Sequence, residues 1–173
     1  MINKFTKGKT AVFIDASNIY FSCKTLGWKV DYKKLFNYFK TNTELVRIAF
    51  YSAINPENEK ERKFQDFLEM NGYIVKRKKV KFIKDKNEET FGGHNKGNID
   101  VELTIDAVHL KDFYDTFILM SGDSDFESLI KYLKVYNKRC IVISAKGHVG
   151  IELIQQAKFI DFKKIRNEIE LKQ

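Results

Sequence analysis

Short apolar runs alternate with amphipathic stretches along almost the whole chain. The apolar runs have the length of buried strands, and the stretches between them carry apolar residues at helical spacing. Strands are predicted over residues 10–15, 45–54, 73–79, 116–120 and 139–144, and residues 159–162 are the candidate for a sixth. Helices are predicted over residues 31–40, 57–71, 99–110, 126–136 and 149–156, with a tail helix or frayed end over 165–171. This alternation implies an α/β fold with a mostly parallel sheet and helices on both faces.

Local signals mark several element ends. Asp31 is a plausible N-cap for the first of these helices, and Gly72 stands where a helix C-cap is expected. Residues 80–97 are the least regular part of the chain. No repeat or linker interrupts the pattern, so we predict one domain over residues 1–173, with a core over about 10–161 and a C-terminal tail over 162–173.

Composition narrows the class of protein. Apolar residues make up 43% of the chain and aromatic residues 14%, which is enough for a sizeable core. No apolar run has the roughly 18 residues needed to span a bilayer, and no secretory signal is apparent. Two cysteines are too few for a disulfide framework, so we expect free thiols and a cytoplasmic location. The net charge of +8 favours polyanionic partners.

Acidic residues follow two of the predicted strands. Asp15 closes the first, and Asp123 and Asp125 follow the fourth after Gly122. Because the carboxyl ends of parallel strands meet at one edge of a sheet, these acids are expected to share a crevice. Asp100 opens the next helix upstream of that strand. Carboxylates gathered in this way suit a hard cation such as Mg²⁺ or Mn²⁺, so the four acids are the predicted catalytic and metal-binding residues.

Each acid also has a structural interpretation. Asp125 can cap the following helix, and Asp100 can complement a helix dipole. Asn18 can be a turn residue or cap instead of orienting a metal or substrate. Asp106 shares an apolar helical line but lies roughly 9 Å along the axis from Asp100, too far for one ion. It would serve a second ion, support the other ligands, or belong to a buried hydrogen-bond network.

The densest basic run lies at the third predicted strand. Arg77, Lys78 and Lys79 are candidate contacts for a nucleic-acid backbone, and the alternative is an edge strand protected by lysine. Lys96, Asn18, Ser121 and Ser124 complete the candidate substrate-binding residues. No phosphate-binding glycine motif, zinc-ligand spacing or catalytic serine arrangement is present, so no organic cofactor is expected.

Three segments resemble the NYN domain family, which includes LabA-like bacterial proteins and belongs to the PIN-like nuclease superfamily. They are Val12-Phe13-Ile14-Asp15-Ala16-Ser17-Asn18, the stretch from Lys96 to Ala107, and Leu119-Met120-Ser121-Gly122-Asp123-Ser124-Asp125-Phe126. The resemblance implies a PIN-like, Rossmann-like three-layer sandwich with central strand order 3-2-1-4-5. It also implies an acidic Mg²⁺ or Mn²⁺ site and ribonuclease activity. The family's motif positions fall on Asp15, Asn18, Asp100, Asp106, Asp123 and Asp125.

The leading hypothesis is therefore a metal-dependent ribonuclease whose partner is RNA. The main alternative is a weak or inactive RNA- or protein-binding regulatory module with the same fold. A receiver-like signalling domain is a third hypothesis, disfavoured because the acidic pair follows the fourth strand instead of the first. An exposed edge strand also permits a homodimer.

Overall fold

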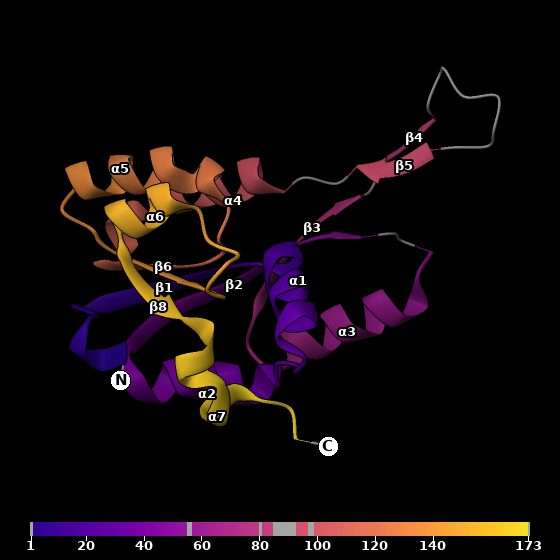
Figure 1. Ribbon diagram of the computed structural model, residues 1–173, viewed down its shortest axis with the longest axis horizontal. Coiled ribbons are helices and arrows are strands. Elements are labelled where there is room, and N and C mark those ends of the chain that lie inside the picture. The colour runs from indigo at the N-terminus through magenta and orange to yellow at the C-terminus, as the bar shows by residue number, and fades with distance from the viewer. Residues whose placement is uncertain (1, 55–56, 80, 85–92, 97–98, 173) are drawn as a thin grey trace.

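The structure is a computed structural model and describes residues 2–54, 57–79, 81–84, 93–96 and 99–172. Its frame is a six-stranded sheet of parallel neighbours in the order β3-β2-β1-β6-β7-β8 (Figure 1). The strands are β1 (Lys9–Asp15), β2 (Glu44–Ile54), β3 (Ile74–Lys79), β6 (Thr116–Met120), β7 (Arg139–Ser144) and β8 (Lys158–Asp161). This confirms the predicted α/β class and central order, and β8 is the predicted sixth strand.

Helices cover both faces of this sheet. They are α1 (Ala16–Leu26), α2 (Tyr32–Asn42), α3 (Glu59–Met70), α4 (Asp100–His109), α5 (Glu127–Val135), α6 (Ile151–Gln156) and α7 (Arg166–Ile169). Short 3-10 helices are η1 (Ile2–Lys4), η2 (Lys111–Phe113), η3 (Ser124–Phe126) and η4 (Phe162–Ile165). Figure 1 shows α4, α5 and α6 on one face and the other α-helices on the opposite face, which makes three layers. Within the described ranges, no helix combines the length and apolarity required to cross a membrane.

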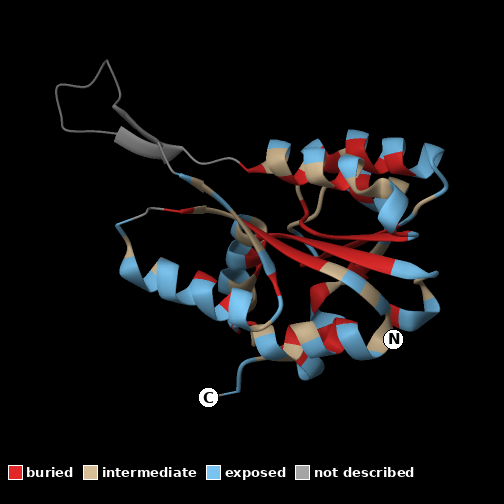
Figure 2. Ribbon diagram, turned by 180° about the vertical axis from the view of Figure 1, so that it is seen from behind, coloured by how far each residue is buried: buried red, intermediate tan, exposed pale blue. Residues whose placement is uncertain are grey.

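The sheet has a hydrophobic core on each face. Ala11 and Phe13 of β1 pack with the α4–α6 layer, whereas Val12 and Ile14 pack on the other side. Successive side chains of a strand point to opposite faces, so a strand buried on both faces needs a continuous apolar run. Figure 2 shows this burial along the central strands. The same rule explains why β1, β6 and β7 were recognisable in the sequence.

Two predicted helix boundaries are confirmed in atomic detail. Asp31 caps α2, because its Oδ1 accepts hydrogen bonds from the backbone N–H groups of Lys33 and Lys34. Gly72 follows α3 with a φ of +89°, and its N–H donates to the carbonyl oxygen of Glu69. Glycine adopts that left-handed conformation without strain, which ends the helix.

The main differences from the predictions are α1 and a hairpin. Helix α1 buries Ser22 and exposes Tyr20 and Phe21, so its sequence lacks a clean helical stripe. The stretch predicted to be least regular contains β4 (Lys81–Lys84) and β5 (Gly93–Lys96), which pair antiparallel in a separate sheet. Figure 1 shows this hairpin beyond the edge of the six-stranded sheet.

Candidate functional site

Asp15 is the anchor of the candidate site. It is the last residue of β1 and the N-cap of α1, and only 5% of its surface is exposed. Its Oδ1 accepts hydrogen bonds from the backbone N–H groups of Ser17 (3.0 Å) and Asn18 (3.2 Å). Its Oδ2 accepts one from the hydroxyl of Ser121 (2.9 Å). The carboxylate is thus fixed at the carboxyl edge of the sheet, as the sequence predicted for this residue.

The environment of Asp15 disfavours the ionised form of its carboxyl group. Burial raises the pKa of Asp15 above its ordinary value, and the negative charge of Asp123 raises it further. The hydrogen bonds from Asn18, Ser121 and Ser17 oppose this rise without cancelling it. A nearby cation would favour the ionised form and lower the pKa of Asp15 again.

The loop after β6 brings the second acid to Asp15. Ser121 is fully buried, and its Oγ also accepts the backbone N–H of Asp123 at 3.2 Å. Asp123 caps η3, because its Oδ1 accepts the N–H of Asp125 at 3.0 Å. The cap is therefore Asp123, not Asp125 as the structural alternative had it. Asp123 is half-buried and Asp125 is exposed.

Asn18 connects the carboxyl ends of β1, β6 and β7. Its Oδ1 accepts the N–H of Gly122 at 2.9 Å and the hydroxyl of Ser144, the last residue of β7, at 3.4 Å. A side chain at Gly122 would collide with the carbonyl oxygen of His148, so this position requires glycine. Sequence reasoning did not assign Ser144 to the site, although its place at the end of the next parallel strand was the available signal.

The structure separates Asp100 from Asp106, although both lie on α4. Asp100 is its first residue and half-buried, and because α4 leads back into β6, this residue belongs to the carboxyl edge. Asp106 instead accepts a hydrogen bond from the hydroxyl of Tyr51 (2.8 Å) and lies near Lys76 (3.2 Å) and Arg47 (3.8 Å). Of the roles that the sequence left open for Asp106, these contacts correspond to the hydrogen-bond network. Its charge is already neutralised.

The other candidate substrate-binding residues lie in environments that differ from one another. Ser121 has no exposed surface, so it positions Asp15 and does not offer a surface to substrate. Arg77 pairs with Glu69 at 2.7 Å, and Lys78 pairs with Glu102 at 2.9 Å. Lys79 and Ser124 are exposed. Lys96 ends β5, and its side chain lies outside the part that the structure describes.

The described residues contain no group of three or more His, Cys, Asp and Glu side chains placed to hold a metal ion. What the fold does bring together is the pair of Asp15 and Asp123 with the amide oxygen of Asn18 nearby. These are hard oxygen donors, which suit Mg²⁺ and Mn²⁺ by type.

The carboxyl edge of the sheet carries all the motif positions named in the sequence analysis except Asp106. The sequence model of the NYN domain matches residues 9–169. The chain belongs to the NYN domain family. NYN domains have a PIN-like nuclease fold, so this chain is an RNA-related nuclease-fold domain. The resemblance inferred from the three motifs is thereby confirmed.

Two relatives extend the comparison of this NYN chain. It is 32% identical over 171 residues to the low amplitude and bright protein LabA of Synechococcus elongatus, covering 96% of this chain and 90% of LabA. A crystal structure of a protein of unknown function from Vibrio parahaemolyticus matches with a TM-score of 0.77 and 27% identity. That match covers 96% of this chain and 98% of the other. The NYN fold therefore extends over nearly the whole chain.

Proposed function

We propose that this NYN domain is a metal-dependent ribonuclease that hydrolyses RNA phosphodiester bonds at the carboxyl edge of its sheet. The observation that carries the proposal is the contact chain from Asp15 through Ser121 to Asp123. Through one buried hydroxyl it connects the carboxylate of Asp15, at the end of β1, to the backbone N–H of Asp123, in the loop after the neighbouring strand β6. Burial, with a smaller contribution from the charge of Asp123, raises the pKa of Asp15, and this disfavours the ionised carboxylate unless the site binds a cation.

The donor set fits Mg²⁺ or Mn²⁺. Asp15, Asp123 and Asp125 would hold the ion, with Asp100 at the start of α4 as the fourth acid of the same edge. Bound there, the ion supplies a nucleophile from water near neutral pH and offsets charge on the phosphate.

The chain's own residues keep the site in shape. The N–H groups at the start of α1 and the hydroxyl of Ser121 fix both oxygens of Asp15. Asn18 holds the backbone of Gly122, and the N–H of Gly150 donates to the Gly122 carbonyl oxygen at 2.9 Å. These bonds orient the loop that carries Asp123 and Asp125, so the acids are pre-organised for a cation.

An exposed face of α1 supports single-stranded RNA as the substrate. Ser17, Tyr20, Phe21 and Lys24 lie within one stripe of the helix by its periodicity, and all four are exposed. Tyr20 and Phe21 are 65% and 56% exposed, with ring centroids 5.5 Å apart. The stripe starts one residue into the helix that Asp15 caps. Aromatic rings beside a cation are the usual platform for unpaired bases.

A cleavage assay tests the proposal. Purified protein is incubated with labelled RNA or DNA in Mg²⁺, Mn²⁺ or EDTA, and Asp123→Asn is compared with wild type. The expected result is RNA cleavage that requires a divalent cation and is lost in the variant at unchanged thermal stability. Cleavage that survives EDTA, or is equal in Asp123→Asn, contradicts the proposal.

One observation favours a second candidate function, RNA binding without turnover. The described carboxylates do not form a ready group of three around a common point. In that case salt-sensitive RNA binding is observed in the same preparations, and no products appear with either cation.

A further inference from the structure

Two groups of basic residues in this chain differ in how their charge is compensated. On β3, Lys76 lies 3.2 Å from Asp106, Arg77 lies 2.7 Å from Glu69, and Lys78 lies 2.9 Å from Glu102. These cations already have carboxylate partners. The run that looks most basic in the sequence therefore presents less net charge than its composition suggests.

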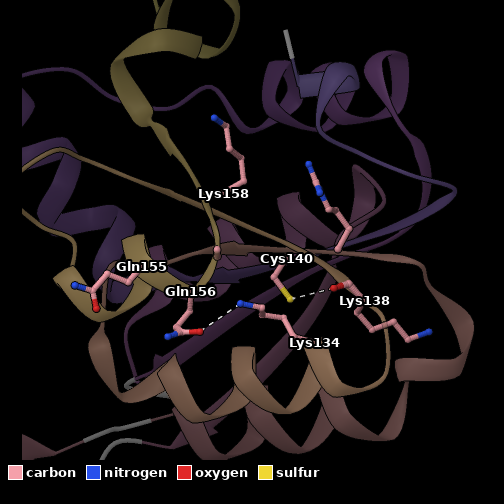
Figure 3. A pocket seen from close by; sticks show the side chains of 8 residues that line it. Lys134, Lys138, Cys140, Gln155, Gln156 and Lys158 are labelled. Carbon is pink, nitrogen blue, oxygen red and sulfur yellow. Dashed lines mark hydrogen bonds between the residues drawn. The ribbon is translucent and has the colours of Figure 1, made fainter.

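The second group lies at the amino ends of β7 and β8. A cavity of about 290 Å³ opens there between the ends of α5 and α6 (Figure 3). Its walls contain no acidic residue and consist of Lys134, Lys138, Arg139, Cys140, Gln155, Gln156, Ala157 and Lys158. Figure 3 shows Lys134 and Lys138 on the α5 side of the strands and Lys158 on the opposite side. Positive charge thus surrounds this edge of the sheet.

None of these four cations forms an ion pair with a carboxylate of the described residues. Lys134 donates to the side-chain oxygen of Gln156 at 3.3 Å, and Lys138 donates to the carbonyl oxygen of Tyr114 at 2.8 Å. Arg139 donates to the carbonyl oxygen of Phe5 at 3.2 Å. Each of these acceptors is neutral. The charge of Asp112 acts on Lys138 at longer range, but this carboxylate is already paired with Lys111 at 2.9 Å.

The cysteine in the cavity does not offset them either. Burial raises the pKa of the Cys140 thiol to about 11, so this group is uncharged near neutral pH. The thiol hydrogen bonds to the carbonyl oxygen of Lys138 at 3.7 Å. The cavity therefore combines cations that have no direct carboxylate partner among the described residues with lining residues that are otherwise neutral.

An adjoining hollow continues the basic surface. Its volume is about 570 Å³, and it shares Lys158 with the first cavity. It adds Lys4 and Lys164, together with the ring of Phe5, which lies 4.5 Å from the Lys158 ammonium. Charge spread over two linked hollows matches an extended polyanion better than one small anion.

We infer that this amino-edge band, defined by Lys4, Lys134, Lys138, Arg139, Lys158 and Lys164, binds the phosphates of single-stranded RNA outside the acidic site. Arg139 and Ser144 are the two ends of β7, so the band and the acidic edge lie roughly 17 Å apart along the strand. A flexible strand can follow that path, with phosphates on the cations and a base near Phe5. The choice of RNA as the polyanion rests on the function proposed above.

Binding without turnover tests this inference. Labelled single-stranded RNA of about 20 nucleotides, longer than the roughly 4–16 nucleotides that an OB fold binds, is titrated in EDTA over a range of KCl. Lys134→Gln/Lys158→Gln removes one cation from each side of the edge. The matched control is Lys29→Gln/Lys40→Gln, which removes the same charge at two exposed lysines outside the band.

The band variant is expected to bind about tenfold more weakly at moderate salt. The slope of log Kd against log salt should fall by about 1.4, since each lost contact to a single strand contributes about 0.7. The control should show neither change. Equal affinity and slope in the two variants overturns the inference, and so does a variant that loses binding to phosphatidylserine vesicles but not to RNA.

The outcome is independent of the cleavage assay. A band variant that loses RNA binding supports the inference even where wild type cleaves nothing. If the band variant binds RNA as wild type does and still shows metal-dependent cleavage, the inference about the band is wrong, whereas the proposed function is unaffected.

Discussion

The hydroxyl of Ser121 donates a hydrogen bond to Oδ2 of Asp15 over 2.9 Å, across 106 positions of sequence. Both residues are buried, and they stand at the ends of two neighbouring strands, β1 and β6. Because the same oxygen of Ser121 accepts the N–H of Asp123, one hydroxyl links Asp15 to Asp123. The position of Asp15 relative to Asp123 therefore depends on the Ser121 side chain.

Ser121→Ala is expected to destabilise the fold and alter the site. A buried carboxylate oxygen loses its donor, which costs about 1–3 kcal/mol. The pKa of Asp15 should rise further, because the Ser121 bond is one of the contacts that lower it. The pH at which cleavage reaches half its maximum should therefore move upward. Urea unfolding and a pH–rate profile measure the two effects.

Ser124→Ala provides the matched control for that variant. Ser124 lies three residues further on, at the start of η3, and is exposed. Stability and the pH profile should both stay within error of wild type. A pH profile that shifts equally in the two variants would contradict the role assigned to Ser121.

Asp15→Asn should stabilise the metal-free protein near neutral pH. Burial raises the pKa of Asp15 above its ordinary value of 3.8, so the unfolded chain gives up this proton at lower pH than the folded one. Ionisation thus disfavours the folded state, and the penalty grows as pH rises above about 3.8. Asparagine removes the charge and is an equally good N-cap.

Thermal unfolding in EDTA across pH measures this effect. The variant and wild type should have similar midpoints at the acidic end, and the variant should melt higher at neutral pH. Metal-dependent cleavage should be lost in the same variant. A variant that melts lower than wild type at neutral pH would show that ionisation of Asp15 does not destabilise the folded protein.

The strands were predictable because both faces of the sheet are buried. Residues 116–120 and 139–144 coincide with β6 and β7, since an apolar run bounded by turn residues has few alternatives there. The edge strand β8 is short and carries fewer apolar residues, and its boundaries differ by one residue at each end. Helix α1 was missed because its exposed aromatic residues hide the helical period.

The site was predictable in part, for a reason of topology. Acids that follow β1 and β6 must meet at one edge once those strands are parallel neighbours, so Asp15 and Asp123 could be placed from the sequence. What a side chain pairs with depends on distant partners. Nothing near Asp106 in the sequence indicates Tyr51 or Lys76, and nothing near Lys134 indicates Gln156.

Asp106→Asn separates stability from activity. The substitution weakens the contacts of Asp106 to Tyr51, Lys76 and Arg47. Tyr51 is buried, but the side chain of Asp106 is 21% exposed, which limits the loss. Loss of about 1–2 kcal/mol of unfolding free energy is expected. Metal-dependent cleavage per folded molecule should be unchanged, unlike in Asp123→Asn. Glu127→Gln is the control, because its pair with Lys131 lies on a helix surface and contributes about 0.3–0.5 kcal/mol. Loss of cleavage in stable Asp106→Asn protein would return this residue to the active site.

Tyr20→Ala/Phe21→Ala tests the exposed face of α1 as a base-stacking platform. Each stacked base contributes about 1–3 kcal/mol, so affinity for single-stranded RNA in EDTA should fall at least about tenfold. The salt slope should stay the same, because no cation is removed. Both side chains are more than half exposed, so stability should change little. Met70→Ala, at the exposed end of α3, controls for loss of apolar surface. If the double variant binds RNA as wild type does while forming fewer dimers, the aromatic pair is a contact between copies of the chain and not a platform for bases.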